Sequence, residues 1–100
     1  MARHRSGLHD QLKALCPSVY FQPPENVRMS YPAIVYALDD IRLHYADDGV
    51  YKHLRRYSVT YITLDPDNDV VDKIASLQYS SFDRFYIANN LNHYAFSVYF

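Results

Sequence analysis

The stretch IRLHYADDGVYKHLRRYSVTYITL, residues 41–64, decides the fold. Its Asp48-Gly49 step lies between two strand-like segments, 41–45 and 50–57, and Asp-Gly in that position is the strongest short signal for a β-hairpin. The second segment continues to Leu64 through β-branched and aromatic residues, which favour strands. A hairpin of this length cannot lie wholly within the core of a 100-residue chain, so we expect its tip to project.

Further strands are predicted on both sides of this hairpin. Val19–Phe21 is a short strand, and Ala33–Leu38 is apolar on both faces, which indicates a central strand covered on both sides. After the hairpin, Ser81–Ile87 and Leu91–Phe100 are two strands joined by residues 88–90. The last strand alternates with a period of two and places Tyr94, Phe96, Val98 and Phe100 on one face and His93, Ala95, Ser97 and Tyr99 on the other.

Two helices complete the predicted fold. Leu8, Leu12 and Leu15 form one face of a helix over residues 6–15, with Ser6 as its N-cap and Pro17 ending it. An acidic turn at residues 65–69 opens the second helix. Its apolar face comprises Val70, Val71, Ile74 and Leu77.

The order of these elements predicts the α+β class: an antiparallel or mixed sheet with two helices on one face and a long projecting hairpin. Residues 1–100 form a single domain, in which residues 1–5 are a flexible N-terminal arm. Cys16 is the only cysteine, so an intrachain disulfide is impossible, and we expect a buried, inert thiol. No segment has the length and apolarity of a signal peptide or a membrane span, so we expect a soluble protein made in the cytoplasm.

The aromatic content predicts contacts with other proteins. Eleven tyrosines and five phenylalanines exceed what a core of this size can hold, and tyrosine is enriched at interfaces. We expect Tyr36, Tyr61 and Phe96 to pack under the helices. Ten basic and eleven acidic residues give a net charge of −1, which supplies no electrostatic attraction to nucleic acid.

Candidate catalytic and metal-binding patterns are incomplete. Asp65, Asp67 and Asp69 begin like a calcium-binding loop, but Val70 and Ser76 stand where that loop needs Gly and Glu, so helix capping is favoured. Gly7 and Gly49 are the only glycines, too few for a phosphate-binding loop. We therefore expect no cofactor and no enzymatic activity.

The histidines lack the spacing of metal ligands. His44 and His53 are placed to face each other across the hairpin, but two imidazoles without a third ligand make a poor zinc site. Asp83 beside Arg84 resembles a charge pair rather than a catalytic dyad. The remaining histidines are scattered at His4, His9 and His93.

The aromatic strands also allow a nucleic-acid platform, because exposed rings can stack on bases. Such platforms interleave Lys and Arg with the rings, and the only basic cluster in the predicted sheet is Arg55-Arg56. Packing inside the protein is therefore the favoured role of these rings: Tyr57, Tyr61, Phe85, Tyr94 and Phe96.

The hairpin carries an acidic turn and a basic cluster. They are either a solvated arm held in register by cross-strand pairs or the two ends of a head-to-tail contact between identical subunits, and the sequence leaves both open. The candidate interface residues are Tyr45, Asp47, Asp48, Val50, Tyr51, Lys52, Arg55, Arg56 and Tyr99.

Several phrases resemble one family of small phage proteins. They are VYFQPP (19–24), YPAIVY (31–36), YAD (45–47), YSVT (57–60) leading to DPD (65–67), and DRFYIANNLNH (83–93). The chain is similar over residues 19–100 to the tail-completion, or tail-terminator, proteins of the neck of long-tailed bacteriophages. The resemblance implies a ring, usually hexameric, at the head-proximal end of the tail tube.

That ring would stop polymerisation of the tube and dock the head connector, with DNA passing through it and no catalytic residues. We expect the hairpin to reach a neighbouring subunit and the C-terminal strand to extend a shared sheet by edge pairing. Two alternatives stay open: another neck component, such as a head-closure, adaptor or tube protein, and a small nucleic-acid-binding module.

Overall fold

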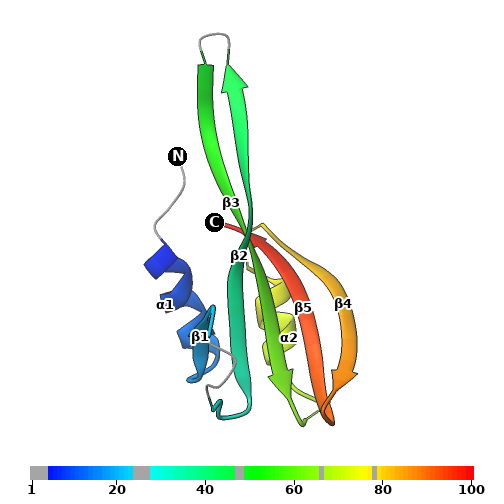
Figure 1. Cartoon of the computed structure of the whole chain (residues 1–100). Coiled ribbons are helices and arrows are strands. Elements are labelled where there is room, and N and C mark those ends of the chain that lie inside the picture. Colours follow the sequence, from blue (N-terminus) through cyan, green and yellow to red (C-terminus); the bar gives the residue numbers. More distant parts are fainter. Residues whose placement is uncertain (1–4, 24–27, 47–48, 66, 78) are drawn as a thin grey trace.

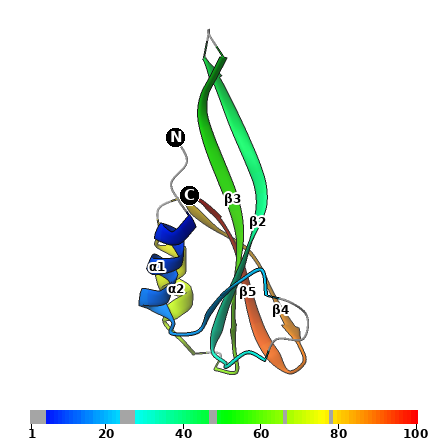
Figure 2. The same cartoon turned by 60° about the vertical axis from the view of Figure 1, so that its left-hand side comes forward.

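A mixed five-stranded sheet forms the centre of the molecule, and two helices lie on one of its faces (Figures 1 and 2). The structure is a computed structural model and describes residues 5–23, 28–46, 49–65, 67–77 and 79–100. β1 runs parallel to β2, and the other neighbouring pairs are antiparallel. The predicted α+β class is therefore confirmed. The elements are α1 (Arg5–Leu15), β1 (Val19–Phe21), β2 (Ala33–Ala46), β3 (Gly49–Thr63), α2 (Val70–Ala75), β4 (Ser80–Ala88) and β5 (Leu91–Tyr99), with the strands in the order β1-β2-β3-β5-β4.

Helix α1 begins one residue earlier than its pattern indicated. Arg5 is its first residue, so Ser6 lies inside the helix and does not cap it, and Arg5 is not part of a flexible arm. The other residues of that predicted arm, 1–4, lie outside the described part of the chain. Leu8 and Leu12 are fully buried one turn apart, and the Cys16 N–H donates to the Leu12 carbonyl at 3.0 Å to close the last turn. No helix in the described part of the chain is long and apolar enough to span a membrane.

A buried polar cluster joins α1 to the sheet. The Tyr36 hydroxyl accepts a hydrogen bond from Arg5 Nη1 at 2.9 Å and lies 2.7 Å from His9 Nδ1. The Arg5 guanidinium also stacks over the Phe21 ring, 4.1 Å from its centre. Burial raises the pKa of Tyr36, and the hydrogen bond and positive charge of Arg5 act in the opposite direction without cancelling that rise.

The core consists of side-chain rows that cross the sheet beneath the helices. In the first row, Ile34 of β2 pairs with Tyr61 of β3, which pairs with Tyr94 of β5. The second row lies two residues further along β2, where Tyr36 pairs with Val59 of β3 and Val59 pairs with Phe96 of β5. Leu8, Leu12 and Ile74 of the helices pack on these rows, and the expected burial of Tyr36, Tyr61 and Phe96 is confirmed.

The opposite face of β2 is covered less than its sequence indicated. Ala33 is buried on that face, but Val35 and Ala37 are only half-buried. Both described helices lie on the other face (Figure 2). An apolar segment of small residues was therefore mistaken for one buried on both sides, because alanine and valine tolerate partial exposure.

Strands β2 and β3 pair far beyond the rest of the sheet. The pairing of β3 with β5 ends at Arg56–Tyr99, whereas the pairing of β3 with β2 continues to Ala46–Gly49. Figures 1 and 2 show this continuation as a two-stranded ribbon beyond the other strands. We call residues 41–46 and 49–54 the arm; the predicted tip residues, Asp47 and Asp48, lie outside the described residues.

The side chain that bonds to the first turn of α2 is an asparagine and not one of the aspartates expected to cap the helix. Asn68 Oδ1 accepts the Val71 N–H at 3.1 Å, while Asp69, at the N-cap, makes no side-chain capping bond. Asp65 Oδ1 accepts the Asp67 N–H at 2.9 Å. Ile74 is the fully buried residue of this short helix, and it packs with Val70, Val71 and Leu77 as the pattern predicted.

The buried Tyr36 hydroxyl gives a stability prediction. Tyr36→Phe should lower the free energy of unfolding by about 1–2 kcal/mol, because Arg5 and His9 lose a buried partner. Tyr20→Phe is the matched control, since its hydroxyl accepts the Ser30 N–H at an exposed position, and should cost less than about 0.5 kcal/mol. Urea denaturation at neutral pH measures both, and equal losses would contradict an anchoring role for Tyr36.

Candidate protein-contact surface

The predicted interface residues divide into four groups. Tyr45, Val50, Tyr51 and Lys52 belong to the backbone of the arm, and Tyr45 pairs with Val50. Asp47 and Asp48 lie outside the described residues. Arg55 is exposed at the base of the arm, and its carbonyl accepts the Phe100 N–H at 2.9 Å. The remaining two residues, Arg56 and Tyr99, are strand partners and half-buried.

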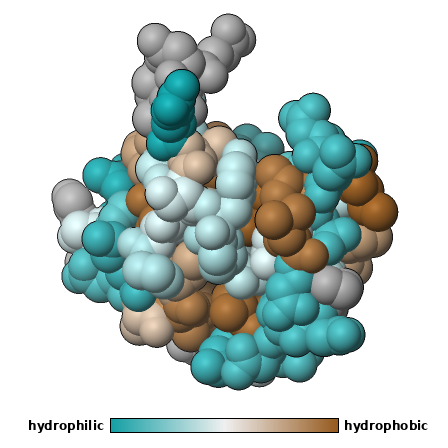
Figure 3. All heavy atoms as spheres, turned by 90° about the horizontal axis from the view of Figure 1, so that it is seen from below, coloured by the Kyte–Doolittle hydropathy of each residue, from teal (hydrophilic) through white to brown (hydrophobic). Residues whose placement is uncertain are grey.

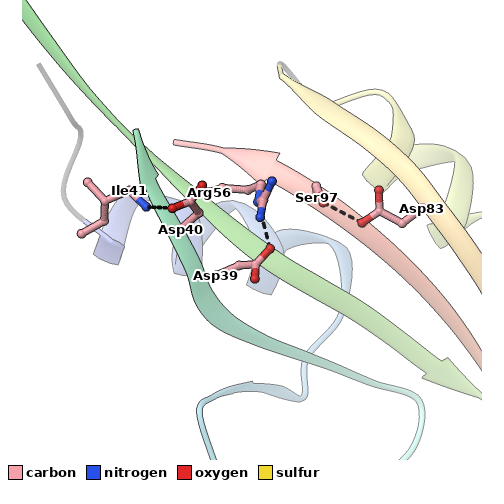
Figure 4. A network of polar contacts seen from close by, with 6 residues as sticks. All are labelled: Asp39, Asp40, Ile41, Arg56, Asp83 and Ser97. Atoms are coloured by element: carbon pink, nitrogen blue, oxygen red, sulfur yellow. Dashed lines mark hydrogen bonds and ion pairs between the residues drawn. The ribbon is translucent and has the colours of Figure 1, made fainter. Parts of the chain in front are cut away.

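Arg56 is held by groups of its own chain. Its Nε donates to Asp39 Oδ2 at 2.8 Å, as Figure 4 shows. A hydrogen bond with Tyr99 and the nearby charge of Asp39 raise the pKa of Arg56. In the same view the Asp40 carboxylate accepts the Ile41 N–H at 2.8 Å, where the register of β2 shifts. This cluster fixes the base of the arm. Arg56 and Tyr99 therefore stabilise the fold of their own chain, whether or not a partner binds there.

The predicted Asp83–Arg84 charge pair is wrong, because each residue has another partner. Asp83 Oδ2 accepts a hydrogen bond from Ser97 Oγ at 2.6 Å (Figure 4). The Arg84 guanidinium stacks over the Tyr86 ring, 4.8 Å from its centre, and that ring stacks on His93. Asp83 is an extra residue in β4, because the register shifts between Phe82–Phe96 and Arg84–Ala95.

The main feature that sequence reasoning missed is an exposed apolar surface on β4. Phe82, Phe85 and Ile87 are 52, 47 and 65% exposed. The Phe82 ring lies 5.4 Å from that of buried Phe96, and the Phe85 ring lies 5.0 Å from that of Tyr94, so both are on the helix-facing side of the sheet. Ile87 follows Phe85 by two residues and shares that side. We call these three residues the β4 apolar face.

Helix α2 contacts both β4 and β5, but it leaves the β4 apolar face about half exposed or more. Figure 1 shows β4 at the margin of the sheet, beside β5. Seen from the end away from the arm, hydrophobic atoms are exposed in several patches between hydrophilic ones, including on the side where β4 lies (Figure 3). Exposed apolar residues grouped in this way make the β4 apolar face a candidate for protein contact.

The bulge explains why the sequence concealed this face. Phe82 and Phe85 are three residues apart, and a regular strand would place them on opposite sides of the sheet. Because Asp83 and Arg84 together oppose Ala95, both rings return to the helix-facing side. In the sequence, the only sign of this bulge is the Asp83-Arg84 pair between the two phenylalanines. The pair can be recognised as a bulge only when the register of β4 against β5 is known.

The C-terminal strand is not an edge strand, so its predicted pairing with another subunit is wrong. β5 lies between β3 and β4, and the sheet ends at β1 and β4. The period-two pattern of β5 correctly indicated one buried side but could not identify its neighbours. Edge strand β4 has a bulge at Asp83 with the charged Arg84 beside it. A bulge and charged residues on an edge strand disfavour the addition of a further strand.

The backbone register of the arm does not place the two hairpin histidines opposite each other. The register pairs His44 with Lys52 and His53 with Leu43, so the two histidines are not strand partners. Among the described residues, no group of three potential ligands is placed to hold a metal ion.

The predicted role of the aromatic strands in packing holds for most of these rings. Tyr57, Tyr61 and Phe96 are buried under the helices and cannot stack on bases. Tyr94 is half-buried, and Phe85 is exposed on the β4 apolar face. Cys16 is buried as expected, with its Sγ 3.5 Å from the Pro32 carbonyl oxygen.

Comparison with protein-family models, with curated proteins and with solved structures finds no match to this chain.

Truncating two contacting rings tests how exposed the β4 apolar face is. Phe96→Ala should cost about 3–5 kcal/mol of stability, because Phe96 is fully buried. Phe82→Ala should cost less than half of that, because half of its side chain already faces solvent. Chemical denaturation of the monomer measures both, and equal losses would show that Phe82 is covered.

Proposed function

We propose that this chain is a structural tail-completion, or tail-terminator, subunit of a long-tailed bacteriophage. In this proposal its copies form a ring, hexameric by resemblance, at the head-proximal end of the tail tube. The ring stops growth of the tube and offers the head connector a docking surface, and DNA passes through it. The protein would act in the virion after assembly in the host cytoplasm.

The observation that carries the proposal is the arm. Its residues pair with each other and, in the described structure, receive no third strand and no helix. A two-stranded ribbon alone is marginally stable in water. A sequence that extends two strands so far beyond their sheet is explained if another subunit supplies the missing contacts.

A second feature supports assembly from identical copies. The β4 apolar face is exposed on the same chain, so each copy offers both a projecting element and an uncovered surface. Contacts between two different surfaces of identical subunits are heterologous, and they generate closed rings when the rotation closes. A terminator needs no catalytic group. One side of its ring binds the last ring of the tube, and its other side differs from a tube ring, so no further tube subunit can be added.

Shortening the arm tests the assembly role. Residues 43–53 can be replaced by Asn-Gly, because Arg42 and Leu54 are strand partners and a two-residue turn can join them. We expect the arm-shortened variant to stay folded, since the core lies outside the arm, and to form no ring. Circular dichroism and native mass spectrometry check the two outcomes, and a ring of unchanged size would contradict this role.

The terminator function itself is tested by imaging tails from particles that lack this protein. Tubes of uncontrolled length are the expected result, because nothing would stop polymerisation. Tails of normal length that fail to join heads would indicate another neck component. Normal, joined tails would exclude a role in the neck, and salt-dependent retention on heparin by the isolated protein would then favour a nucleic-acid-binding module.

A further inference from the structure

Each copy has an arm without cover and an apolar face without cover, and the two cannot meet within one chain. The arm extends from one end of the sheet, and the described β4 residues approach the other end through the β4–β5 turn (Figure 1). That turn is tight, with Asn89 and Asn90 at positive φ and Ala88 paired with Leu91. Covering either surface therefore requires a second molecule.

The apolar face is bordered by acidic residues. Ile87 pairs with Asn92, which pairs with Thr63, so Ile87 lies about 10 Å across the sheet from the end of β3. The chain from that end to α2 is acidic. Residues 65–76 contain four aspartates and one lysine, a net charge of −3, and all four aspartates are exposed: Asp65, Asp67, Asp69 and Asp72.

The strands of the arm carry basic residues. Positions 41–46 and 49–54 contain Arg42 and Lys52 and no acidic residue, and Arg55 follows at the base; the acidic residues of the hairpin, Asp47 and Asp48, lie between the two strands in the sequence. The same strands contain apolar and tyrosine residues, including Leu43, Tyr45, Val50 and Leu54. Strands that carry basic and apolar residues thus match an apolar face with an acidic border, and such complementarity favours both a partner and an orientation.

Resting on the proposed ring, we infer that the arm of one copy docks on the β4 apolar face of the next copy, with its basic residues toward the acidic segment 65–72. The contact is made through side chains rather than by adding a strand to β4. Bulging at Asp83 and the charged Arg84 beside it interrupt the regular edge there. Arm and face are different surfaces, so the contact runs head to tail around the ring.

Two variants separate the arm from its docking site. The arm-shortened variant described above removes one surface, and Ile87→Asp places a charge in the other at a position that is 65% exposed. Ser81→Asp is the matched control: it adds the same charge to the same strand, at an exposed position paired with Ser97 on the opposite side of the sheet. Phe85→Ser replaces Ile87→Asp if circular dichroism shows that variant to be unfolded.

Native mass spectrometry at matched concentrations gives the readout. We expect Ile87→Asp to weaken association at least about tenfold, and Ser81→Asp to assemble as the wild type does. The arm-shortened and Ile87→Asp proteins should each be monomeric alone and form a heterodimer when mixed. Nothing larger should appear, because that heterodimer retains only an altered face and a shortened arm.

The contrary results are distinct. If Ile87→Asp forms the wild-type ring while the arm-shortened variant does not, the docking site is wrong and the proposed ring stands. If both variants are monomeric but form no heterodimer, the head-to-tail contact is wrong. If the wild type forms no oligomer at any concentration, both the ring and its docking contact are overturned.

Discussion

The shortage of helical cover over a large sheet is the constraint on which the rest of this structure depends. Helix α1 has 11 residues and α2 has 6, so they measure about 16 Å and about 9 Å. Strand β3 alone has 15 residues, or about 50 Å of extended chain, and the longest dimension of the molecule is 51 Å. Two short helices cannot cover a sheet built on such strands.

The helices bury the side-chain rows at the centre of the sheet, but they leave the β4 apolar face exposed and do not reach the arm. Over the central strands, Leu8, Leu12 and Ile74 seal the rows of aromatic side chains, and the Arg5–His9–Tyr36 cluster fixes the orientation of α1. At the margin the same rows continue onto β4, from buried Phe96 to exposed Phe82 and from Tyr94 to Phe85. The core and the β4 apolar face are thus parts of one layer of aromatic side chains. The part that packs against the helices is buried, and the part on β4 is exposed.

The excess of tyrosine and phenylalanine has a structural explanation in this arrangement. An uncovered aromatic layer costs free energy in water, because apolar area remains hydrated. In the proposed ring, a neighbouring subunit would cover that apolar area on assembly. The central aromatic residues would then stabilise the monomer, and those on β4 would stabilise the oligomer. The proposed ring accounts for both uses of the aromatic residues.

The sequence predicted what depends on local pattern. The leucine spacing of α1, the alternation in β5 and the apolar residues around Ile74 each indicated the correct element and its buried side. The order of the strands in the sheet could not be predicted, because a central strand and an edge strand show the same alternation. The pattern therefore indicated β5 as an edge strand, whereas β4 occupies that edge.

The candidate site was predicted in part. The arm residues were identified by charge and by hairpin length, but Arg56 and Tyr99 proved to be engaged within the chain. The β4 apolar face was missed because it depends on the bulge at Asp83, and an extra residue changes which side every following residue occupies. Such a shift is visible only once the partner strand is known.

Hydrogen exchange of the wild-type chain, measured below and above the concentration at which it assembles, tests the central claim most directly. Exchange reports the opening of individual backbone amides, so it distinguishes the arm and β4 from the helix-covered centre. The account predicts that amides in residues 49–54 and 82–87 become slower together on assembly, while those of β5 change little. Protection of the arm that is the same at all concentrations, or assembly that leaves residues 82–87 unchanged, would contradict it.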